Sequence, residues 1–203
     1  MKYKCKLRYT DTIYLNVGEN GTVQHAFRAN NIFDPDYSGT GHQPRHHDLL
    51  AEIYDNYTVT KSKLSVKVVG FSNTTDDAQA LGIRAGPDNT LEIPNISIAA
   101  LHEMGRTAST SWTMVKASEP LATRTISKTW SQSRMKTIGG VNNDDVYMGQ
   151  TDGSGPSKQD YFIIFATSAG LGIVGDDPPS LRLLVTVDYE VIYTGMKGNL
   201  PQD

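Results

Sequence analysis

Residues 180–193 read SLRLLVTVDYEVIY, and this stretch carries the clearest strand pattern in the chain. Every odd position from 181 onward holds an apolar or aromatic residue: Leu181, Leu183, Val185, Val187, Tyr189, Val191 and Tyr193. A β-strand sends alternate side chains to opposite faces, so the pattern predicts a strand with one continuous apolar face. That face needs a second layer to cover it, which favours a layered β-fold.

Seven other segments show similar alternation between turn-rich stretches, and each is predicted to be a strand. They cover residues 2–16, 22–30, 57–71, 80–86, 110–117, 122–132 and 160–170, with a small slip in the alternation near Thr60. Apolar residues at helical spacing predict short helices at about 47–55 and 95–106. No linker, low-complexity segment or internal repeat interrupts the chain, so we expect a single domain over residues 1–203.

Eight strands with two short helices confined to the connections predict an all-β fold, most simply an eight-stranded viral-type jelly roll. With the strands lettered B to I in chain order, that topology packs B, I, D and G in one sheet against C, H, E and F in the other. The expected BIDG sheet therefore contains residues 2–16, 180–193, 57–71 and 122–132.

Composition excludes several classes of protein. The chain has 203 residues, a net charge of -3 and a single cysteine, so no disulfide forms within it. No apolar run approaches the roughly 20 residues that span a bilayer, and no signal peptide is recognisable, so we expect no membrane partner. Motifs of serine hydrolases, P-loop proteins and paired CxxC sites are missing from the sequence. We therefore expect a protein that is not an enzyme and holds no cofactor or metal.

Lysine and arginine are unevenly distributed over the expected strands. The opening KYKCKLRY, residues 2–9, is positive at every second position. Ten of the 19 lysines and arginines fall on the four strands of the expected BIDG sheet: Lys2, Lys4, Lys6, Arg8, Lys61, Lys63, Lys67, Arg124, Lys128 and Arg182. The assignment is weakest in 122–132, where Ile126 and Trp130 share the parity of the two cations; Trp130 lies either on the cationic face or in the core.

Two interpretations of this cationic face remain open. Asp188 and Glu190 lie on the even face of 180–193 and are able to form cross-strand ion pairs in an ordinary solvated sheet. Exposed pairs contribute only about 0 to 1 kcal/mol each, and two acids do not neutralise ten cations. The pattern favours a face that meets a polyanion, with Lys and Arg neutralising phosphates without reading bases.

Residues 25–65 carry a resemblance to a known family. The matching pieces are FRAN at 27–30, FDPDYSGTGHQP at 33–44, IYDNYTV at 53–59 and SKLSV at 62–66. They resemble the coat proteins of circovirus-like viruses, which have circular single-stranded DNA genomes and encode a replication initiator. The opening KYKCKLRYTDTI and the closing LRLLVTVDYEVIYTG resemble the first and last strands of such proteins. The chain departs from these coat proteins at His46 and His47, where they often have Gly and an aromatic residue.

The resemblance implies a capsid subunit that self-assembles into a small icosahedral T=1 shell of about 60 copies. The sheet containing residues 2–16 would face the lumen and the single-stranded DNA, and the protein would reside in the virion and, during assembly, in the host nucleus or cytoplasm. Relatives usually carry an arginine-rich arm before their first strand, whereas this chain starts directly in it. Either such an arm has been removed and holds much of the genome affinity, or the sheet face acts alone.

Other functions have weaker support in the sequence. A coat protein of a small RNA virus would share the fold, and a trimeric receptor-binding or glycan-binding jelly roll would expose an aromatic-rich pocket. A cupin-like metal site would use His42, His46, His47 and Glu52, but these lie on a loop and a helix start rather than on barrel strands. Acidic pairs such as Asp34 and Asp36 have no EF-hand spacing, which favours ordinary loop residues over calcium ligands.

Overall fold

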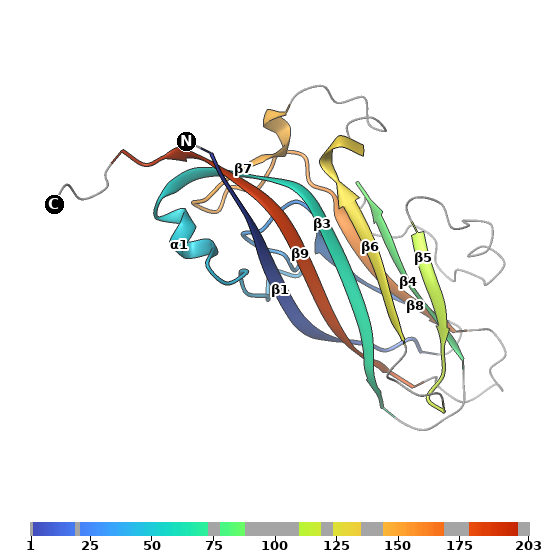
Figure 1. Cartoon of the computed structure of the whole chain (residues 1–203). Coiled ribbons are helices and arrows are strands. Elements are labelled where there is room, and N and C mark those ends of the chain that lie inside the picture. Colours follow the sequence, from blue (N-terminus) through green and yellow to red (C-terminus); the bar gives the residue numbers. More distant parts are fainter. Residues whose placement is uncertain are drawn as a thin grey trace.

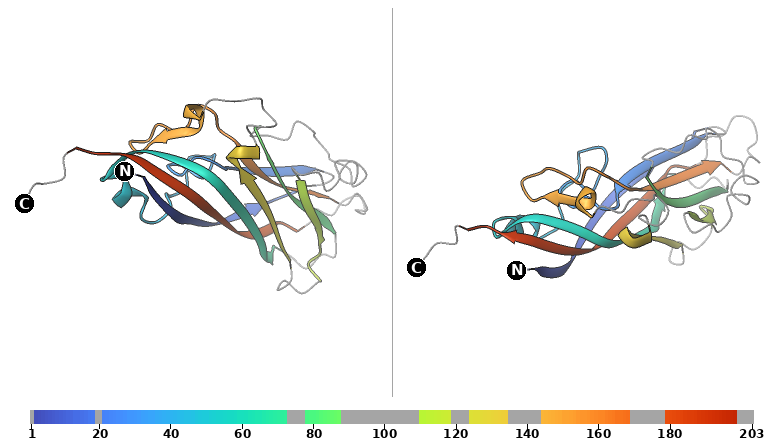
Figure 2. Two further views of the ribbon diagram at one scale, coloured as in Figure 1. Left: turned by 45° about the horizontal axis from the view of Figure 1, so that its top comes forward. Right: turned by 90° about the horizontal axis from the view of Figure 1, so that it is seen from above.

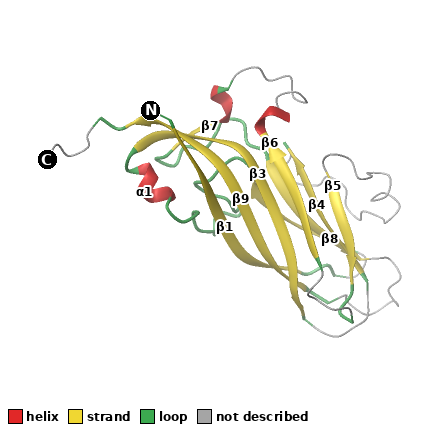
Figure 3. Cartoon of the chain, in the orientation of Figure 1, coloured by secondary structure: helices red, strands yellow, loops and turns green. Residues whose placement is uncertain are grey.

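The computed structural model describes residues 2–18, 21–72, 78–87, 110–118, 124–134, 144–168 and 179–198. Strands dominate these residues and form two layers, with helix confined to short connections (Figure 3). The strands are β1 (Tyr3–Leu15), β2 (Thr22–Arg28), β3 (Tyr54–Phe71), β4 (Gln79–Gly86), β5 (Thr110–Val115), β6 (Thr125–Ser131), β7 (Met148–Gln150), β8 (Tyr161–Ser168) and β9 (Leu181–Met196).

The first sheet has the order β1-β9-β3-β6, and the second has the order β2-β8-β4-β5 (Figure 1). All of the pairings are antiparallel. In the strand letters of a jelly roll these orders are BIDG and CHEF, so the predicted topology is confirmed. The two sheets are separate layers when viewed from above (Figure 2).

Strand β9 organises the core because it pairs along its length with both β1 and β3. Its odd positions from Leu181 to Tyr193 are all buried, as the alternation predicts. They join residues of the second sheet, such as Phe162 and Ile164, in one hydrophobic cluster between the layers. Burying a residue of this size contributes about 1.5 to 3 kcal/mol, so the inward face fixes the register of the first sheet.

Irregularities in β3 determine which of its side chains point outward. The register against β9 shifts between Val59 and Lys61, and again between Val68 and Gly70. The first shift is the slip predicted near Thr60: a bulge adds one residue, so Val59 and Leu64 both face the core despite their opposite parity. Lys61 and Lys63 consequently point outward.

Three short elements differ from the expectations. Helix α1 (His47–Ala51) is shorter than the predicted 47–55, because Tyr54 already pairs with Met196 as the first residue of β3. Strand β7 and the 3-10 turn Asp145–Tyr147 before it were not predicted, since three residues are too few to show a period. The helix predicted at 95–106 lies outside the described residues.

Candidate nucleic-acid interface

The outward face of the first sheet is strongly basic. Side chains directly opposite one another in antiparallel strands share a face, so the register maps this surface residue by residue. One row across the sheet holds Arg8, Asp188, Lys63 and Thr129, and the next holds Lys6, Glu190, Lys61 and Ser131. We call the basic face the set of eight exposed cations Lys2, Lys4, Lys6, Arg8, Lys61, Lys63, Lys67 and Arg182.

Two carboxylates neutralise part of this face. Arg8 donates from Nε to Asp188 Oδ1 at 2.6 Å and from a terminal nitrogen to Oδ2 at 3.2 Å. The ammonium of Lys6 lies 4.0 Å from Glu190 Oε1, and the Lys6 and Arg8 side chains remain 82% and 68% exposed. Pairs this exposed contribute at most about 1 kcal/mol and are screened by salt.

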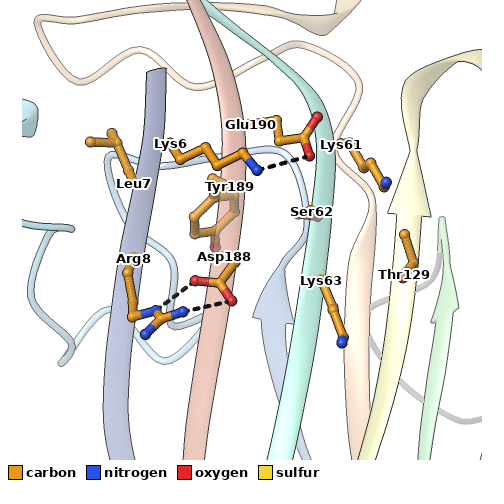
Figure 4. A pocket seen from close by; sticks show the side chains of 10 residues that line it. All are labelled: Lys6, Leu7, Arg8, Lys61, Ser62, Lys63, Thr129, Asp188, Tyr189 and Glu190. Atoms are coloured by element: carbon orange, nitrogen blue, oxygen red, sulfur yellow. Dashed lines mark hydrogen bonds and ion pairs between the residues drawn. The ribbon is translucent and has the colours of Figure 1, made fainter. Parts of the chain in front are cut away.

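Lys61 and Lys63 lie on the other side of the two acids and form no ion pair with any residue that the structure describes. Figure 4 shows both side chains extending from β3 away from Asp188 and Glu190, with no dashed line to any side chain drawn. Each acid therefore sits between two cations and compensates one of them. The eight cations of the basic face exceed these two acids by six, so the basic face keeps a positive potential.

A hollow of about 590 Å³ lies across these two rows (Figure 4). Its lining includes cations from β1 and β3 and the hydroxyl-bearing Thr129 of β6. Ammonium, guanidinium and hydroxyl groups are the donors that proteins present to phosphate oxygens. The arrangement is chemically suited to binding an extended polyanion.

The prediction that Arg124 and Lys128 belong to this outward face is wrong. Lys128 lies directly opposite the buried Leu64, and both cations are only partly exposed, whereas Thr125, Ser127 and Thr129 face outward. Burial lowers the pKa of Lys128, and the charge of Arg134 lowers it further. In β6 the polar Thr and Ser side chains face solvent, and the longer cations extend along the inner side near the sheet edge.

Trp130 shares that inward parity and belongs to the core. It is 2% exposed, and its indole Nε1–H donates to Asp160 Oδ2 at 2.9 Å. It is therefore unable to stack with nucleic-acid bases on the basic face. The alternative that placed Trp130 in the core is confirmed.

Tyr14 is an exposed aromatic residue on the outward face that sequence reasoning missed. It lies opposite Arg182 in the β1–β9 register, and its side chain is 64% exposed. The Arg182 guanidinium carbon stands 5.7 Å from the centre of the Tyr14 ring, within cation–π range. The sequence did contain a signal for this placement, because Tyr14 occupies an even position in 2–16, as the cations of that strand do.

His42 and His47 face different partners in the structure. His47 is buried, and its Nδ1 lies 2.8 Å from the Tyr193 hydroxyl, while burial lowers its pKa. His42 instead faces two backbone carbonyls, those of Gln43 and Thr10. Within the described part of the chain no group of His, Cys, Asp and Glu side chains has a geometry that holds a metal ion.

Asp34 and Asp36 fix the loop that follows β2. The Arg28 guanidinium donates to the Asp34 carboxylate at 2.6 Å, and the His25 ring nitrogen Nε2 lies 3.0 Å from Asp36 Oδ1. Arg28 also donates to the main-chain carbonyls of Asp34 and Asp36. These acids have protein partners, so the start of FDPDYSGTGHQP is a structured loop held against β2.

Comparison with solved structures finds the same fold in viral capsid proteins. A 60-mer of the BFDV capsid protein matches with a TM-score of 0.53 and 10% identity, over 100% of this chain and 98% of that one. A decameric BFDV capsid protein matches with a TM-score of 0.50 and 10% identity, over 96% of this chain and 99% of that one. The structure of the Macrobrachium rosenbergii nodavirus gives 0.50 and 12% identity, over 98% of this chain and 60% of that one.

No protein-family model matches the chain, and no curated protein matches it in sequence. At 10 to 12% identity the structural likeness establishes the fold, which is the jelly roll of viral capsid proteins. Among the described helices none is both long and apolar enough to cross a bilayer.

Proposed function

We propose that the protein is the capsid subunit of a circovirus-like single-stranded DNA virus, and that it assembles into a closed icosahedral shell. Its 203 residues act as one jelly-roll domain with a structural rather than catalytic role. The basic face turns toward the genome, and the loops form contacts between subunits. The observation that carries the proposal is the coincidence of a capsid jelly roll with unpaired cations on one sheet.

Phosphate neutralisation suits the chemistry of the basic face. Lys61, Lys63 and their neighbours present charge without a built pocket for any single base, which favours binding that depends on the backbone and on salt. Tyr14, held beside Arg182, offers an aromatic surface on which an unpaired base stacks. Such stacking favours single strands over duplex, in keeping with a single-stranded genome.

Assembly is the direct test of this function. Purified protein at high concentration, with and without a single-stranded DNA oligonucleotide, is expected to form closed particles in negative-stain electron microscopy and to elute as a large species in size exclusion. Nuclease digestion of the contents then separates DNA from RNA cargo. Elution as monomers or trimers under all of these conditions would contradict the proposal, and trimers would favour a receptor-binding jelly roll.

A further inference from the structure

A second hollow lies at the edge of the basic face, on the other side of β1. Strand β1 pairs only with β9, so its outer edge is free of strand partners within the described residues. The segment 42–46 runs beside this edge and encloses a space of about 540 Å³ with it. We call this space the β1 notch; its lining residues are Lys6, Leu7, Arg8, Thr10, His42, Arg45 and His46.

The β1 notch is continuous with the basic face. Lys6, Leu7 and Arg8 line both this notch and the hollow over the first sheet, so β1 is the shared wall of the two. A flexible chain lying across the sheet is therefore able to pass over β1 and enter the notch without leaving the positive surface. The volume exceeds that of one phosphate and leaves room for an attached sugar.

Charge in the notch is positive and poorly compensated. Arg45 is exposed and forms no ion pair with any described residue. No carboxylate is among the lining side chains, and the acids paired with Lys6 and Arg8 belong to the sheet side of β1. Arg45 thus presents an unoccupied guanidinium fork, the group that binds two oxygens of one phosphate most effectively.

The hydrogen-bonding surroundings of His42 raise its pKa and favour its charged form. Its Nδ1 lies 2.8 Å from the Gln43 carbonyl oxygen, and its Nε2 lies 3.0 Å from the Thr10 carbonyl oxygen. A carbonyl oxygen only accepts, so both contacts act as hydrogen bonds only when both ring nitrogens carry hydrogen, and the arrangement favours the protonated ring. The ring also packs against Tyr9, with centroids 4.7 Å apart.

The surroundings of His42 act on its pKa in opposing directions. The Gln43 carbonyl has the largest effect and raises the pKa of His42. Partial burial lowers this pKa, whereas the Thr10 carbonyl and the Asp11 carboxylate raise it. Arg45 lowers it by repulsion. An anion placed between His42 and Arg45 would relieve that repulsion, so both side chains gain from the same ligand.

We propose that the β1 notch binds one phosphate group of the nucleic-acid backbone, held by Arg45 and Lys6 beside the His42 ring, whose charged form the bound anion would favour. This inference rests on the proposed function and refines it: the genome is neutralised over the open sheet and anchored at one built site on each subunit. Arg45 and His46 serve no packing role that explains their convergence here, since both are exposed.

Two single substitutions distinguish a built site from diffuse attraction. Arg45→Ser and Lys67→Ser each remove one charge from an exposed side chain that has no ion pair among the described residues. Binding of a fluorescein-labelled oligothymidylate is measured by anisotropy, with circular dichroism melting as the check on folding. We expect Arg45→Ser to weaken binding about tenfold, equivalent to about 1.4 kcal/mol, and Lys67→Ser to weaken it much less.

A second arm identifies the source of the phosphate. Inorganic phosphate is added as a competitor, and an oligothymidylate with an uncharged methylphosphonate backbone replaces the natural one. The proposal expects the uncharged strand to bind wild type and Arg45→Ser equally, and phosphate to compete less well in Arg45→Ser. Binding of inorganic phosphate that depends on Arg45, with oligothymidylate affinity unchanged by its loss, overturns the assignment to nucleic acid.

The remaining outcomes distinguish the proposed site in the β1 notch from the proposed function of the protein. Equal losses in Arg45→Ser and Lys67→Ser overturn the β1 notch as a site but leave the proposed genome-binding face in place. Failure of wild-type protein to bind any oligonucleotide or form particles overturns the proposed function, whereas inorganic phosphate binding at Arg45 then survives as a separate property of the notch.

Discussion

Replacing Lys4, Lys6, Lys61 and Lys63 by serine together is expected to lower the nucleic-acid content of assembled particles severalfold while leaving the fold intact. All four side chains are exposed on the basic face, so their loss removes no core packing. Each phosphate contact with a single strand contributes about 0.7 to the slope of log affinity against log salt. The fourfold variant should therefore bind oligonucleotides with a slope lower by roughly 3.

The measurement combines the absorbance ratio of purified particles at 260 and 280 nm with oligonucleotide titrations at several salt concentrations. A control that removes three charges instead of four replaces Lys116, Lys158 and Lys197, which lie off the basic face, by serine and should leave cargo nearly unchanged. The opposite change, Asp188→Asn with Glu190→Gln, removes the two acids between the cations and should raise both the affinity and the salt slope. Unchanged cargo in the fourfold variant would exclude the basic face as the genome contact.

Alternation in the sequence predicts inward and outward side chains well in some strands of the first sheet and poorly in others. In β9 the apolar face is continuous, and in β1 only Asp11 interrupts it, so parity alone placed Lys6 and Arg182 outward correctly. In β6 one face is Thr and Ser and the other mixes Ile126 and Trp130 with cations, so hydrophobicity assigns inside and outside poorly. Large apolar side chains determined the outcome there, because burying Trp130 outweighs the cost of partly burying Lys128.

The β1 notch could not be predicted from the sequence. Arg45 and Lys6 are far apart in the sequence, and no local period relates a loop to the strand edge beside which it packs. The structure joins them through His42, whose hydrogen bond to the Thr10 carbonyl ties the loop to β1. The close spacing of the histidines of 42–47 suggests one group. The backbone, however, turns at His46, where φ is 70°, and His47 is buried in the core.

Trp130→Phe is expected to cost about 3 kcal/mol of unfolding free energy, because it loses a hydrogen bond to a carboxylate and part of the core packing. The indole Nε1–H is the hydrogen-bond donor to Asp160 Oδ2, and Asp160 is fully buried. Its other oxygen, Oδ1, has no hydrogen-bond partner among the described residues. Phenylalanine therefore leaves a buried carboxylate without its side-chain donor. Urea unfolding of dissociated subunits at fixed protein concentration measures the loss.

The cost of Trp130→Phe should depend on pH in a definite direction. Burial raises the pKa of Asp160, while the hydrogen bond from Trp130 and the charge of Lys158 lower it. Removing the indole donor raises that pKa further, so the folded variant binds a proton more readily than the unfolded chain does. Stability gained by this proton is present below the unfolded pKa and is lost as pH rises through the folded pKa. The deficit should therefore shrink as the solution is acidified from neutral pH.

Adding Asp160→Asn to Trp130→Phe separates the buried charge from the lost packing. Asparagine keeps the shape but carries no charge, so the double variant should recover part of the stability at neutral pH and lose the pH dependence of the single variant. The coupling between the two positions should be about 0.5 to 3 kcal/mol, as for residues that share one hydrogen bond. A deficit that is independent of pH and unaffected by Asp160→Asn would mean that packing alone accounts for Trp130. In that case the volume of the Trp130 ring alone would keep this side of β6 inward, and its hydrogen bond to Asp160, the residue before β8, would contribute nothing measurable.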